Sequence, residues 1–394
     1  MNITVLQENL IKALTHASRI ITTKAQMPIL SHIKLDADKQ GLMISSTDLE
    51  IGLRLRVGAK VDQPGSITVP SRVITELINN AGPGALQLTV TKEELSIQGG
   101  GLKASVAGMS PEEFPTLPPF PDQSTIELPA DHLTQAINKV GFAAATDDSR
   151  PVLTAIQVKA QDSHLELAGT DGFRLSWVKL SHAQAANSSK SEKTSKEKKP
   201  QEWLIPARAL QEITRLITPN VKQIKLGLTD KSTQVIFQLG DIELISRLVS
   251  GEFPDFHKIM PDSGDTVVEM SRSALLRAMR LAAIFARESA NIVRFTIQKD
   301  QLIISANAPQ VGGQESTVDA KVDGPEAQIA FNYRYVLDYL NCGDSSAVQL
   351  LMTNALGPGL WLEINPSTKQ SKNEITSLDF KHVIMPVRVE TTQE

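Results

Sequence analysis

One strand–turn–helix segment recurs three times in this chain of 394 residues. Each copy has a short apolar run, a turn, an Arg, and then a helix-like stretch with an acid four residues after the Arg. The Arg stands at positions 72, 208 and 334, a spacing of roughly 130 residues, which is the size of a whole domain. Solenoid and propeller repeats are much shorter, at about 20–50 residues. The chain is therefore expected to contain three related domains in tandem.

The start of each third predicts an amphipathic helix, over residues 7–21, 130–144 and 273–287. In each helix four apolar residues follow the spacing i, i+4, i+7, i+11, so that they form one stripe facing a core. A short apolar run follows each helix and predicts a strand. The stripes are Leu10, Leu14, Ala17 and Ile21; Leu133, Ile137, Val140 and Ala144; and Leu275, Met279, Ala282 and Ala286, and the runs begin at Pro28, Pro151 and Asn291.

Short alternating or apolar runs bounded by Gly, Asp and Asn predict several strands in each third. Two helices with several mostly antiparallel strands per unit indicate an α+β fold with the helices on one face of a sheet. The repeat places the domains at residues 1–123, 124–262 and 263–394. The Lys-rich segment 187–200 fits no repeat and is expected to be a solvated loop.

Composition limits the classes of protein that fit. The single cysteine, Cys342, excludes a disulfide within the chain and suits a reducing compartment. The sequence has no signal-peptide pattern and no apolar run of membrane-spanning length, so a cytoplasmic protein is expected. The formal net charge of -4 argues against general polyanion binding, although a local basic face remains compatible with it.

No motif in the sequence indicates catalysis. The seven His residues lack metal-ligand spacing, and no Gly-rich phosphate loop is present. Asp147 and Asp148, and the Thr-Asp-Gly turn at Asp171, fit ordinary loop and turn residues better than a metal or catalytic site. We expect no catalytic residue, metal or cofactor, with a hydrolase around these three acids as the minor alternative.

Two of the predicted helices carry a basic face. Lys12, His16 and Arg19 lie opposite the apolar stripe of the first helix, and Arg277, Arg280 and Arg287 share a face of the third. The second helix is weaker, with Gln135, Asn138 and Lys139. The stretches 9–24 and 272–287 contain no acid, which suits a surface that follows a phosphate backbone without reading bases. An ordinary solvated face is the alternative for any one helix.

The repeated Arg has two interpretations. Arg72, Arg208 and Arg334 each have an acid at i+4, namely Glu76, Glu212 and Asp338, so a local ion pair is the simpler one. A phosphate contact is the other.

Several segments resemble the bacterial DNA polymerase III beta subunits, the sliding-clamp family. The most specific are the tail Val-Ile-Met-Pro-Val-Arg-Val at 383–389 and the segment Thr-Asp-Gly-Phe-Arg-Leu at 170–175. The resemblance covers essentially the whole chain. It implies three DNA-clamp domains, each with two helices packed on antiparallel sheets, and a head-to-tail homodimeric ring that holds duplex DNA topologically and independently of sequence. It also implies a processivity factor without enzymatic activity and without a membrane partner.

The resemblance further implies partners and site residues. The partners are the polymerase III catalytic subunit, the clamp loader, and repair and translesion proteins that carry a clamp-binding motif. With the basic faces, the expected DNA contacts are Lys12, Arg19, Lys24, Arg72, Lys139, Arg150, Arg208, Arg277 and Arg280. The implied peptide pocket comprises Leu153, Thr170, Gly172, Phe173, Arg174, Leu175, Pro254, Lys258, Ile259, Val383, Ile384, Met385, Pro386, Val387 and Arg388.

The ring seam would join Ile284 and Phe285 to Ala104 and Val106 of the other chain, with burial of Phe285 in its own domain as the alternative. Family members often carry His where Phe173 stands, and residues 390–394 extend past the motif. The competing hypothesis for the whole chain is a protein-interaction scaffold that does not bind DNA.

Overall fold

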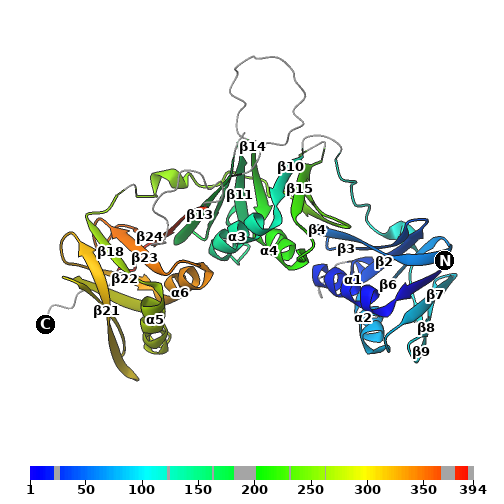
Figure 1. The fold of residues 1–394 in the computed structure, drawn as a ribbon, viewed down its shortest axis with the longest axis horizontal. Helices are drawn as coiled ribbons and strands as arrows, with labels where there is room; N and C mark the ends of the chain where they lie inside the picture. The colour runs from blue at the N-terminus through cyan, green and yellow to red at the C-terminus, as the bar shows by residue number, and fades with distance from the viewer. Residues whose placement is uncertain are drawn as a thin grey trace, which may run out of the picture. The chain divides into compact units, whose positions relative to one another are not determined.

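The computed structural model describes residues 1–21, 27–121, 125–161, 164–181, 201–229, 232–261, 263–364 and 378–388. The chain forms two compact units (Figure 1). Unit 1 holds Met1–Ala130 and Arg208–Leu248. Unit 2 holds the described residues of Asp131–Gln184, Lys190–Ala207 and Val249–Glu394.

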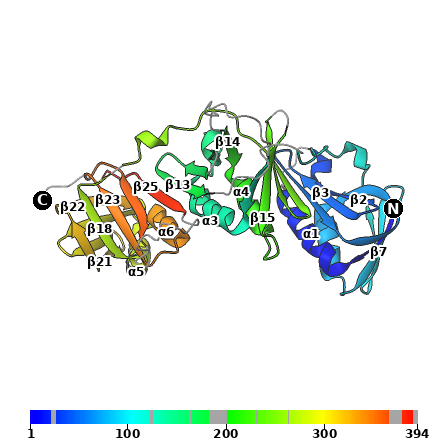
Figure 2. The same cartoon turned by 45° about the horizontal axis from the view of Figure 1, so that its top comes forward.

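Unit 1 contains two antiparallel sheets and the helices α1 (Gln7–Ile20) and α2 (Ser71–Asn80), which pack on each other. The five-stranded sheet has the order β5 (Ala59–Gln63), β1 (Asn2–Leu6), β7 (Ala85–Thr91), β8 (Glu94–Gly99), β9 (Leu102–Ala107). The eight-stranded sheet has the order β10 (Ile126–Pro129), β15 (Gln223–Leu228), β16 (Gln234–Leu239), β17 (Ile242–Arg247), β4 (Ile51–Val57), β3 (Gly41–Thr47), β2 (His32–Asp38), β6 (Gly65–Pro70). Helix α1 lies against β3 and β4 (Figure 2).

Unit 2 is built on one twelve-stranded antiparallel sheet. Its order is β14 (Gln201–Pro206), β11 (Ala155–Ala160), β12 (His164–Thr170), β13 (Arg174–Ser181), β25 (Asp379–Ile384), β24 (Gly359–Ile364), β23 (Ala347–Met352), β18 (Thr266–Ser271), β21 (Gly312–Asp323), β20 (Gln301–Ala308), β19 (Ile292–Gln298), β22 (Ala327–Asn332). Helix α5 (Arg272–Ala286) packs on α6 (Tyr333–Cys342) and on β20 and β21. Of the other two described helices, α3 (Ala130–Val140) belongs to unit 2 except for its first residue, and α4 (Ala207–Leu216) belongs to unit 1 except for its first residue.

The sheets continue from one third of the sequence into the next. At what we call the first junction, β17 of the second third pairs with β4 of the first, and Ser246 lies opposite Ile51. At the second junction, β25 of the last third pairs with β13, and Ile384 lies opposite Arg174. The two compact units therefore follow the sheets rather than the three repeats, and the domain boundaries 1–123, 124–262 and 263–394 stay predictions.

The apolar stripes predicted for the helices form their buried faces. The described helices end within a few residues of the predicted limits, and Ile20 is the last buried stripe residue of α1 in place of Ile21. The predicted strands at Pro28 and Pro151 are wrong. Both segments are single 3₁₀ turns, Pro28–Ser31 and Pro151–Thr154, because Pro has the helical φ angle and needs no amide partner at a helix start.

Three of the sequence predictions lie outside the described residues: the contact residue Lys24, the Lys-rich segment 187–200, and the extension 390–394. Among the described helices, none is long and apolar enough to span a membrane.

Candidate functional site

The turn between β12 and β13 is held by its own side chains. Thr170 Oγ1 donates to the carbonyl of Arg174 (2.5 Å) and accepts from the amide of Gly172 (3.0 Å). Asp171 Oδ1 accepts from the amides of Phe173 (2.9 Å) and Arg174 (3.0 Å). Gly172 has φ of 92°, which a residue with a side chain rarely adopts. The turn therefore presents the Phe173 side chain outward, with 59% of it exposed.

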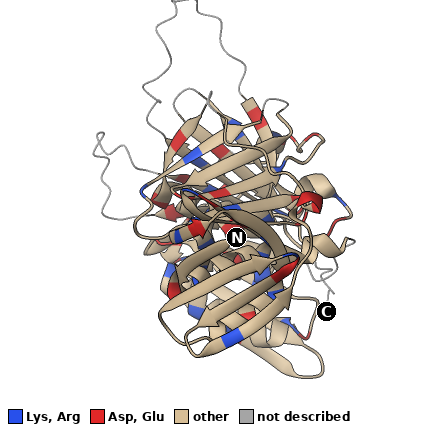
Figure 3. Cartoon of the chain, turned by 90° about the vertical axis from the view of Figure 1, so that its right-hand side faces the viewer, with Lys and Arg blue, Asp and Glu red and all other residues tan. Residues whose placement is uncertain are grey.

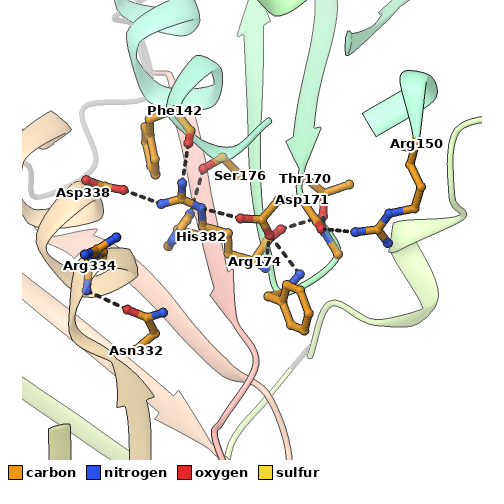
Figure 4. A network of polar contacts seen from close by, with 12 residues as sticks. Phe142, Arg150, Thr170, Asp171, Arg174, Ser176, Asn332, Arg334, Asp338 and His382 are labelled. Carbon is orange, nitrogen blue, oxygen red and sulfur yellow. Dashed lines mark hydrogen bonds and ion pairs between the residues drawn. The ribbon is translucent and has the colours of Figure 1, made fainter. Parts of the chain in front are cut away.

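Arg174 links this turn to the last third of the chain (Figure 4). Its guanidinium donates to Asp171 Oδ2 (3.1 Å), to Asp338 Oδ2 on α6 (2.6 Å) and to the carbonyl of Phe142 (2.6 Å). It also lies over the ring of Tyr335 (4.5 Å to the centroid). With only 10% of its side chain exposed, Arg174 supports the second junction, and its predicted role in peptide binding stays a prediction.

Arg150 extends over the same turn. Its Nη2 donates to the carbonyl of Asp171 (2.9 Å), and a Cβ on Gly172 would lie 3.0 Å from its Nη1. Arg150, a predicted DNA contact, is exposed, and its guanidinium packs against the Thr-Asp-Gly turn.

An apolar cluster lies behind the turn. Its buried members come from both sides of the second junction and from the linker that follows β17, and they pack with partly buried Val152 and Met260. Around this cluster three apolar side chains are exposed: Phe173 (59%), Ile259 (47%) and Met385 (36%). Exposed apolar residues grouped around a buried cluster are typical of a surface that binds a partner. The buried members are Ala155, Ala168, Leu175, Trp177, Leu204, Phe253, Phe256, Leu360 and Val383.

The tail is both a strand and part of this surface. Val383 and Ile384 are buried in β25, whereas Met385 and Arg388 are exposed. Backbone bonds fix the tail, because Met385 N donates to the carbonyl of Phe173 (2.8 Å) and Val387 N to that of Ala330 (2.8 Å). The structure thus brings most of the predicted pocket residues together. Leu153 and Thr170 are buried, and Pro254, Lys258 and Ile259 are exposed on the linker.

His382 lies in the interior of the second junction. Its Nδ1 shares a hydrogen bond with Ser176 Oγ (2.7 Å), and its ring stacks on Tyr339 at 5.3 Å. Burial, with the Arg174 charge as a second cause, lowers the pKa of His382 to about 3. The imidazole is therefore neutral at physiological pH.

The basic faces of α1 and α5 are exposed as predicted. Lys12, Arg19, Arg277 and Arg280 are all solvent-accessible. No acid occurs in α1 after Glu8 or anywhere in α5. Elsewhere the two signs of charge are interspersed over the strands (Figure 3).

The prediction that Lys139 lies on a solvated basic face is wrong. Its side chain is 6% exposed and its Nζ forms an ion pair with Glu363 Oε2 of β24 at 2.5 Å. It also lies over the ring of Phe380 at 4.7 Å. Lys139 is a buried partner within the second junction, because α3 turns that position toward β24 and leaves Gln135 and Asn138 to solvent.

The three repeated Arg residues differ in their contacts. Arg72 forms the predicted i+4 ion pair with Glu76 (2.9 Å). The same prediction is wrong for Arg208, which pairs with Asp48 (2.8 Å), while Glu212 pairs with Arg215.

The predicted i+4 ion pair is also wrong for Arg334. Asp338 is bound to Arg174, and Arg334 Nε donates to the hydroxyl of Tyr333 (3.4 Å). Arg208 thus supports the first junction through the turn of Asp48, whereas Arg72 and Arg334 stay on the surface.

The residues predicted for a ring seam fall in two groups. On α5, Ile284 is 49% exposed, Phe285 is half-buried and Leu281 is exposed. Val311, in the turn between β20 and β21, is a further exposed apolar residue. On β9, which ends the five-stranded sheet, Val106 is buried in its own unit.

Ala104, its neighbour on β9, is half-buried. A contact with a second chain at β9 would therefore use the strand edge and Ala104 more than the Val106 side chain.

Two of the three acids considered for catalysis, Asp147 and Asp171, have structural roles. Asp147 accepts hydrogen bonds from the amide and hydroxyl of Ser149, and Asp171 builds the turn described above. Within the described ranges, no cluster of His, Cys, Asp and Glu could hold a metal ion. Burial raises the pKa of the Cys342 thiol to about 12, which is the behaviour of a packed thiol.

Family models for the DNA polymerase III beta subunit match three consecutive segments. The N-terminal domain matches residues 1–118, the central domain residues 127–255 and the C-terminal domain residues 257–388. The chain belongs to the DNA polymerase III beta subunit family. It is built of three tandem clamp domains and functions as a sliding clamp for DNA polymerase in replication, which makes it a processivity factor.

Individual relatives agree with this family. A beta sliding clamp from Synechocystis sp. is 28% identical, over 97% of this chain and 98% of the relative. The fold matches the DNA polymerase sliding clamp of Bacillus subtilis with a TM-score of 0.88 and 24% identity, covering 99% and 100% of the two chains. A Pseudomonas aeruginosa clamp bound to griselimycin matches with a TM-score of 0.87 and 25% identity, over 99% and 100%.

The sequence did not single out several residues of the second junction. Trp177, Ser176 and His382 lie in the largely buried strands β13 and β25, where the sequence indicates only burial, and Phe142 contributes a carbonyl that no side-chain pattern marks. The partner of Arg174, Asp338, was noticed only for its spacing from Arg334.

Proposed function

We propose that two copies of this chain close head to tail into a ring around duplex DNA, and that the ring slides without reading sequence or catalysing a reaction. The acid-free, exposed basic faces of α1 and α5 carry this proposal. Loose contacts between such faces and phosphates supply attraction that does not depend on sequence. The exposed apolar residues Leu281, Ile284 and Val311 are the proposed seam on one side, and the edge strand β9 is the seam on the other.

The second junction is the proposed docking site for linear segments of partner proteins. These are the polymerase catalytic subunit, the clamp loader, and repair and translesion proteins. The exposed side chains of Phe173, Ile259 and Met385 provide apolar contacts, and a flexible Met can repack around different anchors. Griselimycin, bound by the Pseudomonas clamp, is the probe proposed for this site. We place the protein in the cytoplasm with its DNA.

A topological test separates the ring from a DNA-independent scaffold. Clamp loaded on a nicked circular plasmid should stay bound through gel filtration, and linearising the plasmid with a restriction enzyme should release it, because only free ends let a ring slide off. Equal retention on both forms would contradict the ring. A solution mass equal to one 42.9 kDa chain would contradict the dimer.

Charge reversal tests the basic faces. Lys12, Arg277 and Arg280 replaced together by Glu should lower loaded clamp and processive synthesis by at least about tenfold, because three phosphate contacts become repulsive. The matched control changes Lys39, Lys92 and Lys299, exposed lysines of strand turns, to Glu, with the same change in net charge. Equal losses in both triple variants would show that overall charge matters and the helix faces do not.

A further inference from the structure

The two junctions share one backbone construction. At the second junction Met385 N donates to the carbonyl of Phe173 (2.8 Å), and at the first junction Arg247 N donates to the carbonyl of Glu50 (2.9 Å). In each case the donor stands at the end of the incoming strand, as the residue after β25 or the last residue of β17, and the acceptor lies in the turn before β13 or β4. The residues at positions 173 and 385 therefore have direct counterparts at 50 and 247.

The turn of the first junction also repeats that of the second. Thr47 Oγ1 donates to the carbonyl of Ile51 (2.9 Å) and accepts from the amide of Leu49 (3.0 Å). Asp48 Oδ1 accepts from the amides of Glu50 (3.0 Å) and Ile51 (2.7 Å). Leu49 has a positive φ of 76°, and its counterpart Gly172 in the second turn has a positive φ of 92°. The first junction thus keeps the scaffold that presents Phe173 at the second.

The first junction keeps apolar cover as well. In unit 1 Leu30 is buried in a cluster with Phe114, and in unit 2 their counterparts Leu153 and Phe253 are both buried. The linker that follows Phe114 lies on β4, since a Cβ on Gly52 would come 2.6 Å from Cδ2 of Leu117.

The side chains at these two paired positions, which we call the rim of each junction, differ between the junctions. Phe173 and Met385 are exposed and apolar, whereas Glu50 and Arg247 are exposed and charged. An apolar peptide anchor that packs on this rim would remove both charges from water, and the cost of that desolvation exceeds the gain from apolar contact.

We propose that the first junction is a silenced copy of the docking site proposed at the second junction, closed to apolar linear peptides by Glu50 and Arg247. The inference rests on the function proposed for the second junction. It predicts that each chain binds one such peptide, at the second junction. It also predicts that apolar rim residues are enough to make the first junction bind one.

The test introduces the apolar rim residues of the second junction at the first junction, in a variant whose second junction has been disabled. In the Met385→Asp variant, Glu50→Phe with Arg247→Met should restore griselimycin binding, measured by calorimetry, to at least about tenfold above the background variant. The matched control, Glu50→Gln with Arg247→Gln, removes the same charges without adding apolar surface and should restore nothing.

Four further results decide between the outcomes. A grafted variant that melts like its background and yet binds no griselimycin would overturn the inference, as would a wild-type chain that binds two molecules. Should the graft fail to fold, the reciprocal variant decides: Phe173→Glu with Met385→Arg should abolish binding, and retained binding would overturn the inference. A wild-type chain that binds none would instead refute the function proposed for the second junction.

Discussion

Replacing Met385 by Asp should weaken griselimycin binding by at least about 100-fold and leave the chain folded. The side chain is 36% exposed beside Phe173, and β25 is anchored through its backbone and through Val383 and Ile384. A carboxylate placed where a bound apolar group must pack loses its hydration, and each 1.4 kcal/mol of that cost weakens binding about tenfold. Titration calorimetry on both proteins measures the change.

The control for this prediction is Val73→Asp. Val73 is 44% exposed on α2, so this substitution also replaces an exposed apolar side chain by an acid, at a different position. It should bind griselimycin like the wild-type chain. Unchanged affinity in Met385→Asp would remove the second junction as the docking site.

Lowering the pH from 6.5 to 5 should cost the wild-type chain about 2 kcal/mol in free energy of unfolding through His382 alone. The group has a pKa of about 3 when folded, against 6.5 as its ordinary value. Between these values the unfolded chain binds a proton and the folded chain does not. The stabilisation is therefore complete above pH 6.5 and is lost as the pH falls toward 3.

The measurement is urea unfolding at the two pH values for the wild-type chain and for His382→Phe. Phe fills a similar space against Tyr339 and cannot titrate, so this variant should lose about 2 kcal/mol less on acidification, whatever its stability at neutral pH. Equal losses in both proteins would show that His382 does not contribute to acid sensitivity.

Periodicity predicted the helices and strands well because burial on one face leaves a repeating pattern in the sequence. The buried faces of α1, α3 and α5 follow the predicted stripes almost residue by residue. The same patterns could not show that β4 pairs with β17, because strand pairing between distant segments leaves no local signal.

The site was predicted less evenly. Motifs located the Thr-Asp-Gly turn and the tail, whose residues do meet at the second junction. Charge patterns misplaced Lys139 and the partners of Arg208 and Arg334, since each of these side chains binds an acid or a hydroxyl that spacing did not predict. A charge spaced along a helix shows which residues can be neighbours on that helix, and tertiary partners compete for the same group.

The position of β25 limits the order in which this protein can fold during its synthesis. It is the last described strand along the chain, yet it lies between β13 and β24 inside the twelve-stranded sheet. A ribosome must release residues 379–384 before the strands of the second and last thirds can join into one sheet. Until then Phe173 has no tail beside it. A partner that recognises the second junction therefore recognises only chains whose synthesis has passed β25.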